Sequence, residues 1–160
     1  MLSSGCDGVG EPRDERLRRW LLIRGRGVAP LDAHVRVEQI RGHSSSKRPS
    51  VQRGDEAILY AAVWQAIFGV VDVVGEPQND PERERWSWTF PIRPISVIAD
   101  LHDAPPVEAA GIFPQSLWRH SHIRLTDEQF DRARALIRSG RRPRTSSKTA
   151  PPRASASSVR

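Results

Sequence analysis

The segment QRGDEAILYAAVWQAIFGVVDVVGEP, which runs from Gln52 to Pro77, decides the fold class. A Gly-Asp turn at 54–55 leads into a run over 56–63 that is rich in Ala, Ile, Leu, Tyr and Val, and this composition predicts a central strand. A second run over 67–74 is apolar at nearly every position and ends at a Gly-Glu-Pro stop, which predicts a strand buried on both faces. We therefore expect these strands to form the central hairpin of a small β-barrel.

Two further strands are predicted on either side of this hairpin. The short apolar run over 18–24 fits a buried first strand. Over 86–92, large apolar side chains alternate with smaller residues, which is the two-residue period of a strand and places Trp86 and Trp88 on one face. Pro91 cannot donate a ladder hydrogen bond, so we expect this strand to lie at a sheet edge or to bend there.

The remaining segments predict smaller elements. We expect a short helix over 31–40, a polar loop over 41–50, a charged loop over 78–85 and a short strand over 122–125. These assignments rest on composition and turn residues, because none of the four segments has a long apolar period.

A capping box predicts a C-terminal helix. The Thr126 hydroxyl and the Gln129 side chain can each accept a hydrogen bond from the other's backbone N–H group. Gly140 is expected to end the helix. Its apolar stripe consists of Phe130, Ala133, Leu136 and Ile137. The predicted class is therefore α+β, a small mixed β-barrel with a few short helices and a C-terminal helix.

Length and charge predict one domain with two tails. The chain has 160 residues, of which 38% are hydrophobic, enough for one modest core. We expect a flexible leader over 1–17, a folded domain over 18–138 and a basic disordered tail over 139–160. The tail carries six basic residues and no acid, so it accounts for the whole net charge of +6. Such a tail can attract nucleic acid non-specifically, or it can serve only as a solubilising end.

The sequence also gives expectations about compartment and bound groups. Cys6 is the only cysteine, which argues against disulfides and a cysteine metal site and fits a reducing cytoplasm. There is no secretory signal pattern and no apolar run of about 18 residues, so we expect no membrane partner. No cofactor or metal is expected.

The tryptophans are candidates for nucleobase contacts. The chain has five Trp against one Tyr and four Phe. Aromatic faces stack on bases, and each stacked base contributes roughly 1–3 kcal/mol. Trp86, Trp88 and Trp118 are the candidates for stacking, and a role in core packing is the alternative for each of them.

The opening Trp20-Leu21-Leu22, the predicted hairpin and the segment LWRHSHIRL from Leu117 to Leu125 resemble the EVE domain family of the PUA-like superfamily. The resemblance implies a PUA-like barrel that binds nucleic acid, DNA or RNA, and encloses one base, for example a modified one, in a pocket.

The same resemblance implies a set of pocket residues. The segment after Leu117 reaches the base pocket in that family. An arginine fork, a hydroxyl and an imidazole can all hydrogen-bond base edges. Arg24 stands where the family has polar residues and can act as a donor, whereas the residues after Tyr60 are alanines. The implied base-binding residues are Arg24, Tyr60, Trp86, Trp88, Trp118, Arg119, His120 and Ser121.

Two other classes of function stay open from the residues alone. The first is an enzyme that acts on a nucleotide or small molecule with His120 or Asp72 as proton carrier. The second is a structural adaptor. The sequence lacks a nucleophile elbow, a P-loop and a glycine-rich dinucleotide motif, and no third ligand accompanies His120 and His122. Non-catalytic nucleic-acid binding is therefore the leading hypothesis.

Overall fold

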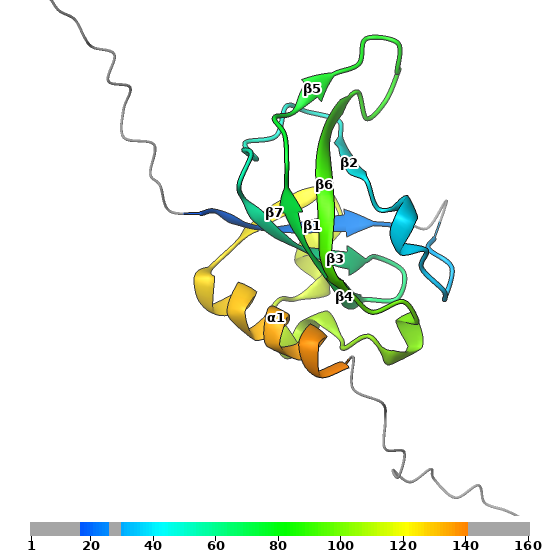
Figure 1. The fold of residues 1–160 in the computed structure, drawn as a ribbon, viewed down its shortest axis with the longest axis vertical. Coiled ribbons are helices and arrows are strands. Elements are labelled where there is room, and N and C mark those ends of the chain that lie inside the picture. Colours follow the sequence, from blue (N-terminus) through cyan, green and yellow to red (C-terminus); the bar gives the residue numbers. More distant parts are fainter. Residues whose placement is uncertain (1–16, 26–29, 141–160) are drawn as a thin grey trace, which may run out of the picture.

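The computed structural model describes residues 17–25 and 30–140. In Figure 1 a strongly curled sheet forms most of the molecule, helix α1 (Asp127–Gly140) lies below it, and β5 with the loop after it projects at the top. The predicted leader over 1–17 and the predicted tail over 139–160 fall almost wholly outside the described residues.

The sheet has seven strands in the order β2-β6-β4-β3-β1-β7, and β5 pairs with β6 beside this path. The first strand runs parallel to β3, and the other pairings in the described sheet are antiparallel. The strands are β1 (Arg19–Arg24), β2 (Gly42–Ser45), β3 (Glu56–Ala61), β4 (Ala66–Val73), β5 (Gln78–Asn79), β6 (Trp88–Val97) and β7 (His122–Leu125).

Short 3-10 turns connect several of these strands. They are η1 (Val37–Gln39), η2 (Leu101–Asp103), η3 (Val107–Ala110) and η4 (Pro114–Leu117). Together with one α-helix, they give the predicted fold class of a small mixed β structure with a C-terminal helix. No helix within residues 17–25 and 30–140 is long and apolar enough to cross a membrane.

The predicted central hairpin is present as β3 and β4. Almost every residue of both strands is buried, because α1 and the curled sheet cover both faces. Gly69 packs directly against the Leu59 side chain, because a Cβ atom added at Gly69 would lie only 2.9 Å from Leu59 Cδ1. The register shifts by one residue between Leu59 and Tyr60, which increases the local twist and helps the sheet to curl.

The capping box begins α1 as the sequence predicts. The Gln129 N–H donates to Thr126 Oγ1 at 3.1 Å, and the Thr126 N–H donates to Gln129 Oε1 at 3.1 Å. The helix buries Phe130, Ala133 and Ile137 against the sheet. A fully buried Phe side chain contributes about 1.5–3 kcal/mol, so this one stripe anchors the helix.

Four local predictions are wrong. The expected charged loop over 78–85 begins with the short strand β5, which pairs with β6. The segment over 31–40 forms only the η1 turn, since its apolar residues follow no helical period. The predicted polar loop over 41–50 contains β2, whose small polar residues pair with β6. The strand containing Trp88 begins at that residue, whereas Trp86 lies in the preceding loop with φ of 56°, so the two rings do not share a strand face.

The prolines of β6 do not mark an edge of the sheet, and an irregularity in the strand pairing lies next to Pro94. This strand lies between β2 and β4. Its register with β4 shifts between Val70 and Val71, so that Ile95 is left out of the pairing on the β6 side. The bulge takes up the ladder interruption that proline causes.

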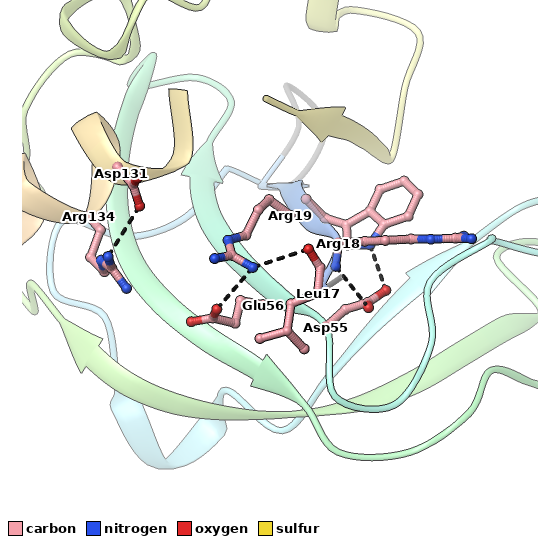
Figure 2. A network of polar contacts seen from close by, with 8 residues as sticks. Leu17, Arg18, Arg19, Asp55, Glu56, Asp131 and Arg134 are labelled. Carbon is pink, nitrogen blue, oxygen red and sulfur yellow. Dashed lines mark hydrogen bonds and ion pairs between the residues drawn. The ribbon is translucent and has the colours of Figure 1, made fainter. Parts of the chain in front are cut away.

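A buried carboxylate fixes the start of β1. Asp55 accepts hydrogen bonds from the Trp20 indole N–H at 2.8 Å, from the Gln52 N–H at 2.9 Å and from the Arg18 N–H at 3.4 Å. Figure 2 shows Asp55 between the turn before β3 and the first residues of β1, with Arg19 beside it. Arg19 forms an ion pair with Glu56 at 3.3 Å. The turn therefore sets the register between the two parallel strands.

Candidate functional site

Side-chain hydrogen bonds connect β2 to the residue before β7, and these two strands are the first and the last in the order of the sheet. The His43 Nε2–H on β2 donates to the Ser121 carbonyl oxygen, just before β7, at 2.8 Å. Because a carbonyl oxygen only accepts, Nε2 must carry the proton. The Ile23 N–H donates to the same oxygen at 2.9 Å, and Ser121 Oγ donates to Ser45 Oγ at 3.1 Å. The sheet is thus closed at this end by a polar seam, which we define as His43, Ser45 and Ser121.

A wide cleft opens beside this seam. It has a volume of about 550 Å³, within the usual range for ligand pockets. Its walls come from the end of β1, the start of β2, the residue before β7 and the loop between β5 and β6. The lining residues are Ile23, Arg24, Gly25, Leu31, Gly42, His43, Ser44, Arg85, Trp86 and Ser121.

Arg24 is the half-buried cation of this cleft. Its Nη1 donates to the Gly42 carbonyl oxygen at 2.8 Å, which ties the end of β1 to the start of β2. Burial lowers the pKa of the guanidinium from its usual value, because removal from water disfavours the charged form. Even a lowered arginine pKa leaves the group charged at neutral pH.

The loop between β5 and β6 brings an aromatic ring to the cleft. Trp86 has φ of 56° and 37% of its surface is exposed. A positive φ is uncommon for a large residue and marks a constrained loop position. Arg83 Nη1 donates to Ser44 Oγ at 3.3 Å, which holds this loop against β2.

A second, smaller pocket adjoins the cleft. Its volume is about 180 Å³, and Ile23 lines both hollows. Tyr60 lies at this pocket and is buried, which raises the pKa of its phenol. Trp118 lies at its rim with 78% of its surface exposed. Of the two alanines after Tyr60, Ala62 lines this pocket, and Gln65 adds a polar side chain to it.

The predicted base-binding residues fall into separate groups. Arg24, Trp86 and Ser121 come together in the cleft. Tyr60 and Trp118 line the adjoining pocket. The other three line neither hollow: Arg119 and His120 are exposed in the turn before β7, and Trp88 lies on β6 with the Arg48 guanidinium 5.6 Å from its ring centre.

Sequence reasoning missed Gly42, His43, Ser44 and Arg85. The first three belong to the segment expected to be a polar loop, where burial alternates along Gly-His-Ser-Ser. A strand of small polar residues has no hydrophobic period to reveal it. One histidine among small residues over 42–45 is only a weak indication of a strand in a single sequence.

The residues considered for catalysis and metal binding lie in ordinary structural settings. Asp72 forms an ion pair with Arg93 at 2.8 Å, between β4 and β6, and lines none of the hollows described above. His122 Nδ1 lies 2.9 Å from Ser121 Oγ, and its ring meets Trp20 at 5.5 Å. Within residues 17–25 and 30–140, no group of three or more His, Cys, Asp or Glu side chains is placed to hold a metal ion.

Comparison with known proteins gives matches among solved structures only. No family model matches this chain. No curated protein matches it either. Rpa0253 from Rhodopseudomonas palustris has 16% identity over 78% of this chain and 93% of its own, with a TM-score of 0.52. Atu2648 from Agrobacterium tumefaciens has 15% identity over 77% of this chain and 92% of its own, with a TM-score of 0.50.

A third similar structure is that of human THYN1 in complex with DNA that contains 5-methylcytosine. It has 14% identity, covers 79% of this chain and 99% of its own, and has a TM-score of 0.50. The fold is PUA-like. At these identities the likeness extends to the fold, which confirms the predicted class and leaves the site to be judged on its own residues.

Proposed function

We propose that this protein is an EVE-type domain that binds nucleic acid without catalysis and holds one base, for example a modified one, in the cleft beside the seam. The cleft carries this proposal, because it brings a tryptophan face, a guanidinium and hydroxyls around one hollow of about 550 Å³. A similar structure with methylcytosine-containing DNA supports the choice of ligand class.

Each wall of the cleft has a role in this proposal. Trp86 provides the stacking face, because a ring at the rim can cover a base that enters from solvent. Ser44 and Ser121 provide small hydroxyls for a base edge. A base must leave its helical stack to enter such a cleft, which favours single strands and weakened or modified pairs.

Binding of labelled oligonucleotides to the full chain tests the proposal. We would measure anisotropy with DNA and RNA that carry one cytosine, 5-methylcytosine or 5-hydroxymethylcytosine in the same sequence, at near-physiological salt. Saturable binding that depends on the central base is the expected result. Trp86→Ala should weaken it by about 1–3 kcal/mol, the contribution of one stacked base.

Two matched variants locate the binding site. Trp88→Ala removes a tryptophan that lines neither hollow, so base selectivity should stay unchanged if the protein is folded. Trp118→Ala tests the adjoining pocket. If selectivity is lost with Trp118→Ala and kept with folded Trp86→Ala, the base lies in the smaller pocket and the cleft assignment is wrong.

A further inference from the structure

The charges of the cleft are unbalanced. Among the lining residues that the structure describes, Arg24 and Arg85 are the cations and none is acidic. Arg24 donates to a carbonyl oxygen, and no carboxylate of the described chain pairs with it. The positive charge of Arg24 is therefore half-buried, and the dipole of the Gly42 carbonyl group stabilises it without a negative charge nearby.

Some of the other arginines of the domain have acidic partners. Five ion pairs hold Arg19, Arg83, Arg93, Arg132 and Arg134 to carboxylates at 2.8–3.6 Å. Arg19 on β1 is the closest comparison, because it leaves the same strand at the opposite end and meets Glu56. Two arginines of one strand thus differ in their surroundings, and the one without an anion faces the ligand cleft.

Burial without a counter-charge has a free-energy cost that a bound anion can offset. The lowered pKa of the Arg24 guanidinium is consistent with this, since desolvation is its cause. A neutral base edge could satisfy the N–H groups but would leave the charge uncompensated. A phosphate both accepts several hydrogen bonds and supplies the missing charge.

We propose that Arg24 binds a backbone phosphate next to the base held in the cleft, and does not read the base itself. This inference rests on the proposed function. Nη1 stays on the Gly42 carbonyl oxygen, which orients the guanidinium, and its other N–H groups contact the phosphate oxygens. Arg85 adds a second, exposed charge at the mouth of the cleft.

Oligonucleotides with single neutral linkages test this without changing the protein. The preferred oligonucleotide would be made with a methylphosphonate at the linkage 5′ of the central base, 3′ of that base, or five linkages away. For the wild-type chain, one adjacent substitution should weaken binding by about tenfold to a hundredfold, as expected for hydrogen bonds to a charged group. The distant substitution should have a much smaller effect.

The corresponding arginine variants complete a double-mutant cycle. The Arg24→Gln protein should bind the oligonucleotide with an adjacent methylphosphonate as tightly as the unmodified one, because the guanidinium that contacts the phosphate is gone. Arg24→Lys keeps the charge without the planar fork and should recover part of the difference. Arg124→Gln removes an exposed arginine of β7 that lines neither hollow, so it should leave the difference intact.

The outcomes separate this inference from the proposed function. If wild-type protein distinguishes the central base but binds all neutral linkages equally well, the phosphate inference is overturned and the base cleft stands. If the penalty persists in folded Arg24→Gln protein, another residue holds the phosphate and the assignment to Arg24 is wrong. If the base makes no difference in any oligonucleotide, the proposed function and this inference both fail.

Discussion

The imidazole Nε2 of His43 lies 2.8 Å from the carbonyl oxygen of Ser121, a residue 78 positions further along the chain. The strands on either side, β2 and β7, stand at opposite ends of the sheet order. Side chains therefore close the curled sheet where no backbone ladder does so, and the candidate cleft opens at that closure. Stability and ligand binding should be linked there.

Removal of the His43 side chain should destabilise the protein. In His43→Ala, a buried ring is lost beside Phe90, 5.6 Å away between ring centres, together with the bond to Ser121. We expect the free energy of unfolding to fall by about 1–3 kcal/mol, measured by urea unfolding. His34→Ala, at an exposed histidine, should change it by less than about 0.5 kcal/mol. If His43→Ala and His34→Ala lower the free energy of unfolding equally, the seam makes no specific contribution to stability.

Asp55 should matter more than a surface carboxylate. In Asp55→Ala the indole N–H of Trp20 and two backbone N–H groups lose their acceptor in a buried place. We expect a loss of at least about 2 kcal/mol in the free energy of unfolding. Asp131→Asn, which breaks the exposed pair with Arg134, should cost at most about 1 kcal/mol. A small loss in Asp55→Ala would contradict the role of this clamp.

Thr126 should contribute through its hydroxyl alone. Thr126→Ala removes the acceptor of the Gln129 N–H at the start of α1, and we expect a loss of about 1 kcal/mol. Thr126→Ser keeps the oxygen and should restore most of it. Thermal unfolding of the three proteins checks this. An alanine variant as stable as the serine variant would mean that water replaces the cap without cost.

Acidification should destabilise the protein through His122. Burial, and secondly the charge of His120, lower the pKa of His122 in the folded state. As pH falls below about 6.5, His122 is protonated in the unfolded chain before it is protonated in the folded chain. The free energy of unfolding that is present above this pH is therefore lost on acidification. His122→Gln should flatten the dependence of the urea midpoint between pH 7.5 and 5.5. His120→Gln should flatten it partly, and an unchanged slope in both variants would rule out this source.

The elements recovered from sequence are those that local physics specifies. The hairpin of β3 and β4 is recognisable because both strands are almost wholly apolar. Helix α1 is recognisable from one capping box and one stripe. By contrast, β2 is a strand because its Gly-His-Ser-Ser residues pair with β6, and no propensity within four polar residues encodes a partner about 45 positions away.

The same distinction explains the candidate site. The family resemblance predicts Arg24 and Ser121 as site residues, and the structure brings them to one cleft. The alternation over 86–92 predicts that Trp86 shares a strand face with Trp88, but Trp86 reaches the cleft from a loop position with positive φ. Trp118 was expected beside it and instead lines the adjoining pocket. Sequence can nominate aromatic and basic residues, whereas tertiary folding decides which of them face the same space.

The position of β1 has a consequence for synthesis on the ribosome. This strand pairs with β3 on one side and with β7 on the other, where Arg19 lies opposite Leu125. A nascent chain can form the first pairing early, but the second edge of β1 stays open until β7 has emerged. Leu21 and Leu22 are fully buried in the finished fold. During that interval this apolar strand presents an unpaired edge to other nascent chains, so translation rate and chaperone access should influence how much protein reaches the native state.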